Sequence, residues 1–203
     1  MRHIWLATVL ATSLVGGQAL ATDQDKKAQR AVEKAEVLEE HALEGSRPPR
    51  SKIITEAEAG AVDPEGAAPL EDALTCLSRT IYWEAKGVER DEMESVANVV
   101  MNRLAHDGFP KTICEVVKQG SESGPCQFSW WCDGRPDHVR EEEPYEAATD
   151  VARVALNGRL KDRTDGALYF HDKRVSPSWA SEFKRTLEAG DFYFYKPAEG
   201  AAR

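Results

Sequence analysis

The sequence predicts an α+β fold that is mainly α, with a small β element and an irregular aromatic loop. Three amphipathic segments carry apolar residues at helical spacing, and a loop rich in Gly, Cys and aromatic residues separates the second from the third. Two short alternating segments follow near the C-terminus. The 203 residues, 41% of them hydrophobic, suffice for one domain of ordinary size plus an extension.

The first predicted helix covers residues 70–85 and ends near Gly87. A second covers 89–107, where Asp91 and Glu94 have the spacing of a capping box and Gly108 and Pro110 end the helix. The expected buried positions of the two helices are Leu74, Leu77, Ser78, Ile81, Val96, Val99, Val100, Arg103 and Leu104.

Further along the chain we expect a short helix over 111–119, a loop over 120–137 and an amphipathic helix over 143–160. Residues 165–180 predict one short strand followed by a turn. The alternating "DFYFYKP" at 191–197 predicts a final strand.

Residues 1–21 have the features of an export signal. A basic start precedes an apolar run that is shorter than the roughly 20 residues of a membrane span, and "ALA" at 19–21 offers small residues for cleavage. A retained anchor is the alternative. We expect the mature protein to be periplasmic or secreted.

Residues 22–70 are rich in Ala, Glu, Lys and Asp and contain no aromatic residue. They predict an acidic flexible linker or a weak solvated helix, because Glu and Lys pair at helical spacing and apolar residues are too few for a core. A docking arm for a partner protein is the alternative. The catalytic domain is expected over 71–197, with a disordered tail over 198–203.

The net charge of −9 argues against nucleic acid as a partner, since phosphates require a basic face. No sequence feature implies a cofactor. The sequence does not decide the oligomeric state, and we expect a monomer.

An even number of cysteines in an exported chain predicts two disulfides. Three connectivities exist, and we favour a local Cys126–Cys132 bond with a long-range Cys76–Cys114 bond. A zinc site built from all four thiolates is the alternative. It would ordinarily contain a more closely spaced pair, so we expect no metal.

Glu84 is the expected catalytic residue, because Tyr82 and Trp83 place it beside aromatic rings. Loss of solvent raises the pKa of a carboxyl group, and a carboxylic acid that keeps its proton near neutral pH can serve as a general acid. The alternative is an ordinary surface glutamate at a helix end.

Two further segments supply expected substrate contacts. The "CQFSWWCDG" loop at 126–134 combines aromatic platforms with polar groups, and "YFHDKRVSPSWA" at 169–180 carries a Tyr, a His and two cations. The expected contacts are Tyr82, Trp83, Gln127, Phe128, Ser129, Trp130, Asp133, Tyr169 and His171. Tryptophans that fill the core and a structural histidine are the alternatives.

Five motifs in order resemble the SleB-type cell wall hydrolases. They are the aromatic-x-E-A-K-G turn at 82–87, the V-x-N-R helix end, G-F-P, Q-F-S-W followed by D-G, and H-x-x-x-V-x-P-x-W at 171–179. The resemblance covers roughly residues 72–195.

The resemblance implies a lysozyme-like, mainly helical fold, peptidoglycan as substrate and Glu84 as the catalytic acid. A second family glutamate would fall at Glu89, one position away from its usual place. A lysozyme-like fold with a single glutamate implies a lytic transglycosylase that cleaves the MurNAc–GlcNAc bond and leaves 1,6-anhydro-MurNAc. If the enzyme hydrolyses instead, Asp133 is the expected second carboxylate.

Two other functions stay open at this point. An N-acetylmuramoyl-L-alanine amidase would need zinc ligands, for which His106, His138 and His171 are available in the domain. A non-catalytic wall-binding module would need no acid at all.

Overall fold

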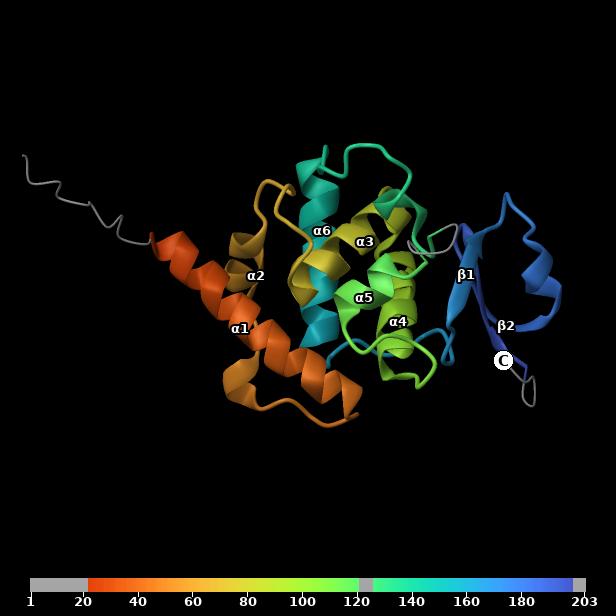
Figure 1. Ribbon diagram of the computed structural model, residues 1–203, viewed down its shortest axis with the longest axis horizontal. Coiled ribbons are helices and arrows are strands. Elements are labelled where there is room, and N and C mark those ends of the chain that lie inside the picture. The colour runs from red at the N-terminus through yellow and green to blue at the C-terminus, as the bar shows by residue number, and fades with distance from the viewer. Residues whose placement is uncertain (1–21, 121–125, 199–203) are drawn as a thin grey trace, which may run out of the picture.

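The computed structural model describes residues 22–120 and 126–198. The expected signal peptide over 1–21 and residues 199–203 of the expected tail lie outside the described residues. Helices pack around α3 in the middle of the molecule, with α1 towards one end and a small sheet at the other (Figure 1). The expected α+β, mainly α fold class is confirmed.

The helices and strands have the following bounds. They are α1 (Asp23–Leu43), α2 (Glu56–Val62), α3 (Ala73–Ala85), α4 (Arg90–Ala105), α5 (Ile113–Lys118), α6 (Glu142–Leu156), β1 (Tyr169–Asp172), β2 (Phe183–Ala189) and β3 (Phe192–Pro197), with short 3₁₀ turns at Arg50–Lys52, Ser129–Trp131 and Ser178–Ser181.

α3 is the central helix and packs against α1, α4, α5 and α6. Its N-terminus is capped by Asp72, whose carboxylate accepts a hydrogen bond from the Thr75 N–H at 2.9 Å. The Cys76–Cys114 disulfide joins it to α5. Gly87, with φ of 82°, follows its C-terminus as predicted.

The second predicted helix forms, but its predicted cap does not. Glu89 is the N-cap of α4 and makes no side-chain capping bond, while Asp91 lies inside the first turn. Glu94 instead pairs with Arg90 and Arg163 at 3.1 Å each. The capping box was therefore wrong, because two arginines compete for Glu94.

The prediction of a flexible linker over 22–70 was wrong for most of that segment. Ala31, Ala35 and Leu38 lie on one face of α1 and are at most 1% exposed within the main core. Ile54 is also fully buried, and its backbone N–H and carbonyl each form a 2.9 Å hydrogen bond with the Asn157 side chain. The segment is thus part of the folded domain.

The charges of this segment explain part of the error. Lys34 does not pair along its own helix; its ammonium donates to the Glu58 carboxylate at 2.7 Å and to the Ile53 carbonyl at 2.9 Å. Glu39 accepts from the backbone N–H of Ile113 at the start of α5. Charged residues that resembled a solvated face therefore hold α1 against α2 and α5.

The sheet is antiparallel with strand order β1-β3-β2. β1 and β3 match the two predicted strands. The strand between them in the sequence, β2, was not predicted because Lys184, Arg185 and Glu188 obscure its alternation. The turn after β2 lies against α4: a Cβ on Gly190 would meet the Glu92 carboxyl, which also accepts from the Asp191 N–H at 3.0 Å.

The two faces of the sheet differ. Phe170, Phe192 and Phe194 lie on the inner face and pack with Val99 of α4. Tyr169 and His171 alternate to the outer face, where both rings contact Trp179 of the 178–181 turn. The outer face of the sheet is therefore an aromatic surface.

Candidate active site

Glu84 lies in the last turn of α3 and is partly buried. Burial raises the pKa of its carboxyl group to about 7, and the nearby positive charge of Arg103 limits the rise. Among the described residues, no hydrogen bond or ion pair engages the Glu84 carboxylate. The group is therefore set to exchange a proton near neutral pH.

Arg103 supplies the positive charge next to Glu84. It lies near the C-terminus of α4 and is fully buried, and its Nε donates to the Leu168 carbonyl at 2.7 Å. Its two Nη atoms have no hydrogen-bond partner. Burial lowers the pKa of Arg103 to about 10, so the guanidinium stays charged at neutral pH.

Three aromatic rings enclose the Arg103 guanidinium. The ring centroids of Phe109, Tyr169 and Phe128 lie 5.1, 5.2 and 5.4 Å from it. Contacts of this kind favour the cation, and they bring together the α4–α5 turn, the start of β1 and the disulfide-bonded loop. Arg103 is thus the point where three distant parts of the sequence meet beside Glu84.

Tyr82 does not contact substrate as predicted, because it is fully buried. Its hydroxyl accepts from the N–H groups of Arg140 and Glu141 at 3.1 and 3.3 Å and forms a short contact with the Glu141 carboxylate. The residue therefore holds the start of α6 against α3. Trp83 is partly exposed, and its indole N–H donates to the Asp137 carbonyl at 3.2 Å.

The Cys126–Cys132 disulfide is present as predicted and closes the aromatic loop. Phe128 and Trp130 point into the core and are 0% and 6% exposed, so these two predicted contacts are wrong. Their neighbours Gln127 and Ser129 are exposed, as is Asp133. The loop thus alternates between core residues and residues open to a ligand.

Asp133, the expected second carboxylate, is engaged by Arg135. Its carboxylate accepts from the Arg135 N–H at 2.8 Å and lies 3.8 Å from the Arg135 side chain. Within the described residues, burial and Arg103 account for the shift in the pKa of Glu84, and no second carboxylate contributes.

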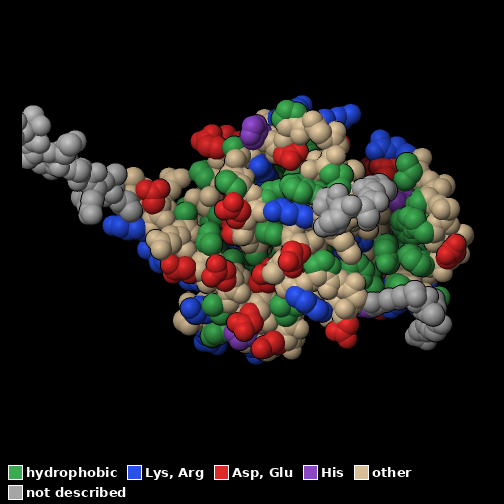
Figure 2. Space-filling view, viewed as in Figure 1, with side chains coloured by type: hydrophobic (Ala, Val, Ile, Leu, Met, Phe, Trp, Pro, Cys, Tyr) green, Lys and Arg blue, Asp and Glu red, His purple; other side chains and the backbone are tan. Residues whose placement is uncertain are grey.

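The outer face of the sheet is aromatic. Tyr169 is 4.7 Å from Phe183 and 5.7 Å from Trp179 between ring centroids, and all three are partly exposed. Hydrophobic side chains gather at this end of the molecule (Figure 2). Because Tyr169 also covers Arg103, this surface continues from the surroundings of Glu84.

His171 lies on the same outer face with both ring nitrogens engaged. Nδ1 donates to the Asp172 carbonyl at 2.9 Å, so in the neutral ring Nε2 accepts from the Tyr195 hydroxyl at 3.0 Å. The ring also stacks on Tyr195, with centroids 5.3 Å apart. His171 therefore orders the aromatic surface from within.

The sequence interpretation missed Arg103, Trp179 and Phe183 as site residues. Arg103 was among the predicted buried positions of the second helix. An arginine at such a position is itself a signal of a site, because a buried charge is costly unless other groups compensate it. Trp179 lies in the motif at 171–179 but was not named as a contact, and Phe183 had no comparable signal because it begins the unpredicted strand β2.

Within the described residues, no group of three His, Cys, Asp or Glu side chains is arranged to hold a metal ion. No helix in this part of the chain combines the length and the hydropathy needed to cross a bilayer.

Comparison with known proteins assigns the family. The model of the family described as Cell Wall Hydrolase matches residues 87–195, which is more than half of the chain. The chain belongs to the cell wall hydrolase family. The resemblance to the SleB-type hydrolases is thereby confirmed, and the family acts on peptidoglycan.

Among solved structures, the catalytic domain of the Bacillus cereus SleB protein is similar to this cell wall hydrolase. The identity is 23%, the alignment covers 61% of this chain and 89% of that one, and the TM-score is 0.48. The comparison with curated proteins finds no match.

The family match begins three residues after Glu84. Arg103, Tyr169 and the disulfide-bonded loop lie inside the matched residues 87–195, whereas α1, α2 and α3 precede them. Family membership and two disulfides together indicate an extracytoplasmic location for this cell wall hydrolase.

Proposed function

We propose that the protein is a lytic transglycosylase that cleaves the MurNAc–GlcNAc bond of peptidoglycan, with Glu84 as general acid and then general base. The single observation that carries this proposal is the Glu84 carboxyl group, whose pKa burial raises to about 7 and which no hydrogen bond from the described residues engages. Such a group is protonated in a large fraction of molecules at neutral pH and is free to reach a substrate oxygen.

In the first step Glu84 donates its proton to the glycosidic oxygen as the bond to the anomeric carbon of MurNAc breaks. The leaving GlcNAc end becomes a free alcohol, and positive charge develops on the MurNAc ring. Glu84 is now a carboxylate, and Arg103 stabilises it by charge. The two unpaired Nη atoms of Arg103 allow this role, since no other acceptor occupies them.

In the second step the C6 hydroxyl of the same MurNAc attacks its anomeric carbon. The hydroxyl proton passes to Glu84, which restores the starting acid, and a 1,6-anhydro ring forms. The nucleophile belongs to the substrate, so its effective concentration is high and water is not required.

The engagement of Asp133 supports this route over hydrolysis. Most glycoside hydrolases place a second carboxylate within about 5–10 Å of the acid, as nucleophile or as base for a water. Asp133, the expected second carboxylate, is exposed and bound to Arg135.

We expect the glycan to lie across three exposed parts of the site. These are Trp83 beside the acid, Gln127 and Ser129 on the disulfide-bonded loop, and Tyr169 with the outer sheet face. Aromatic rings offer apolar surfaces to the C–H faces of sugars, and the loop offers hydrogen-bonding groups.

The test is mass spectrometry of the products that purified residues 22–203 release from peptidoglycan. We expect 1,6-anhydro muropeptides from the wild type and none above background from Glu84→Gln. Glu65→Gln is the matched control, because Glu65 is an exposed glutamate in the turn after α2 and should leave the products unchanged.

Other products would replace the proposal. Reducing-end sugars would indicate a hydrolase, and free stem peptides whose release stops on chelation would indicate an amidase. Normal products from Glu84→Gln would remove Glu84 from the mechanism.

A further inference from the structure

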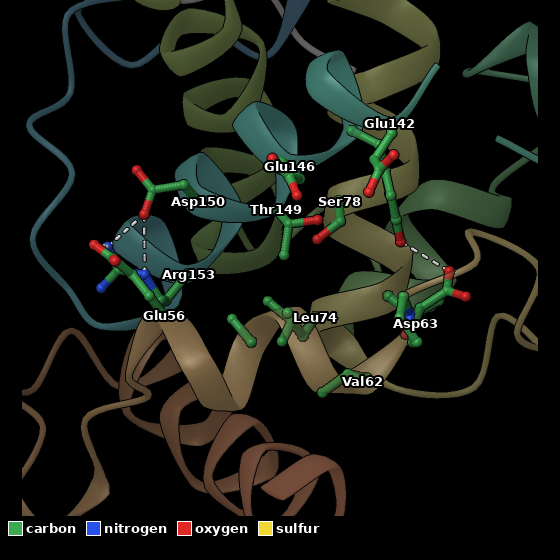
Figure 3. A pocket seen from close by; sticks show the side chains of 15 residues that line it. Glu56, Val62, Asp63, Leu74, Ser78, Glu142, Glu146, Thr149, Asp150 and Arg153 are labelled. Carbon is green, nitrogen blue, oxygen red and sulfur yellow. Dashed lines mark hydrogen bonds and ion pairs between the residues drawn. The ribbon is translucent and has the colours of Figure 1, made fainter. Parts of the chain in front are cut away.

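A second pocket lies between α2, α3 and α6, with a volume of about 530 Å³ (Figure 3). Glu84 is not among the residues that line it. Residues of α3 form its floor, and α2 and α6 form opposite walls. Its α2 and α3 residues precede the matched residues 87–195, so these parts of the pocket come from the N-terminal part of this chain.

The pocket is strongly acidic. Five carboxylates and one arginine line it. Asp63 is satisfied by Tyr145 at 2.8 Å and by Arg79 at 3.7 Å, and Arg153 binds both Asp150 and Glu56.

Glu142 and Glu146 differ from the other carboxylates of the pocket. Neither has a hydrogen bond or an ion pair within the described residues, and Figure 3 shows both on the α6 wall. They are four residues apart on one helix, a spacing at which like charges repel. A cation in the pocket would relieve that repulsion.

Two buried hydroxyl groups of the floor also lack partners. Ser78 is 0% and Thr75 is 1% exposed, and neither hydroxyl oxygen has a hydrogen bond. Serine and threonine inside a helix usually bond to a preceding carbonyl, so these free groups need another partner. In Figure 3 the Ser78 side chain points into the pocket beside Thr149.

Apolar residues also line the pocket. They are Leu74 of the α3 floor and Ala59 and Val62 of the α2 wall. The combination of apolar lining, free hydroxyls and two unpaired carboxylates fits a short alkyl chain that ends in an ammonium group, because such a ligand buries methylenes and donates three hydrogen bonds.

We propose that this pocket binds a primary alkylammonium group. Two sources carry the same chemistry: free aliphatic diamines, and the side-chain amine of a diamino acid in the stem peptides of peptidoglycan. The second source rests on the proposed function, and the first does not.

The test measures binding to purified residues 22–203 by calorimetry and by NMR titration. The probe is 1,5-diaminopentane, with 1,5-pentanediol as its neutral control. We expect saturable binding of the diamine, shifts of α3 and α6 amide signals, and no saturable binding of the diol.

The variants separate the pocket from general charge. Glu142→Gln/Glu146→Gln should raise the diamine Kd about tenfold, since two ion pairs from exposed carboxylates on the α6 wall are lost. Glu143→Gln/Glu182→Gln removes the same charge at exposed positions outside the pocket and should change Kd less than twofold. Ser78→Ala should fold normally and weaken binding, because it removes one acceptor without creating an unpaired group.

A muropeptide with a diamino acid, compared with its N-acetylated form, distinguishes the two sources. Binding that acetylation abolishes assigns the stem peptide, and binding of the diamine alone assigns a free amine. The inference is overturned if neither probe binds, or if the two double variants weaken binding equally. Product analysis is independent of these titrations, so a failure here is distinguishable from a failure of the proposed function.

Discussion

Two pairs of an acidic residue and an arginine involve α3, and they differ in the hydrogen bonds that the acidic residue accepts. Asp63 and Arg79 are 6% and 2% exposed, and the Asp63 carboxylate accepts three hydrogen bonds of 2.8 Å, from Tyr145 and from the N–H groups of Ala67 and Ala68. Glu84 beside Arg103 accepts none in the described structure, and burial raises its pKa to about 7.

The comparison shows that burial alone does not decide the role of a carboxylate. Three hydrogen bonds hold the Asp63 carboxylate in place, so Asp63 ties the turn after α2 to α3 and α6. Burial without such bonds favours the protonated form of Glu84, which is left with a proton to exchange. Substitutions at the two pairs should separate these roles, with the largest effect at Glu84.

Replacing Glu84 by Gln should have the largest effect. We expect the rate of glycan cleavage to fall about 10³-fold, the usual contribution of a positioned general acid. The measurement is the initial rate of product release at pH 6, with circular dichroism to show that the fold is kept. A loss smaller than tenfold would mean that Glu84 is not the acid.

Asp63→Asn should mainly affect stability. We expect a loss of about 3 kcal/mol, because Arg79 would remain buried without a counter-charge. Urea unfolding at pH 7 measures the loss, and Glu65→Gln, an exposed change in the same turn, is the control. Activity per folded molecule should not change, and a specific loss of activity would show that the two pairs are not distinct.

Glu84→Gln should also stabilise the protein at high pH. The pKa of Glu84 is about 7 in the folded protein against an ordinary value of 4.5, so the folded state holds the proton more tightly. The contribution of the Glu84 proton to the free energy of unfolding is complete below pH 4.5 and is lost as the pH rises through 7.

Gln cannot ionise, so the variant should be more stable than the wild type by at most about 3 kcal/mol at pH 8, and by less with solvent screening. At pH 4 the difference in the free energy of unfolding should almost vanish. Urea unfolding of wild type and variant at both pH values measures the difference. An equal difference at the two pH values would contradict the raised pKa.

Arg103→Met should give the smallest change, a shift in the pH profile. Arg103 lowers the pKa of Glu84, so its removal should keep the acid protonated to higher pH. The alkaline limb of the pH profile of kcat/KM should move to higher pH. The maximum of kcat/KM should fall, because the Glu84 carboxylate formed in the first step loses its counter-charge. Tyr169→Phe keeps the ring over Arg103 and should leave the limb in place.

Much of the fold could be predicted from the sequence because local signals agreed. The buried positions of α3 and α4 recur at helical spacing. The turn after α3 has a positive φ at Gly87, and glycine is the residue type that favours it. The docking of α1 could not be predicted this way. Its buried face is built from Ala31, Ala35 and Leu38, and two alanines do not distinguish a packed helix from a solvated one.

The candidate site was predicted only in part. Glu84 was predicted as the acid from its aromatic neighbours, and this role stays a prediction. Tyr82 instead belongs to the core, and the residues of the disulfide-bonded loop alternate between buried and exposed. The role of Arg103 depends on rings contributed by Phe109, Phe128 and Tyr169, which are far apart along the chain. Only the folded structure brings them to one place.

The pair of hydrogen bonds between Ile54 and Asn157 spans 103 residues, and this has a consequence for the order of synthesis. A ribosome adds about 5–20 residues per second, so some 5–20 s pass between the two positions. Throughout that interval the first helices have no α6 to pack against. Tyr169, whose ring lies over Arg103, is made later still, so the surroundings of Arg103 and Glu84 are complete only near the end of synthesis.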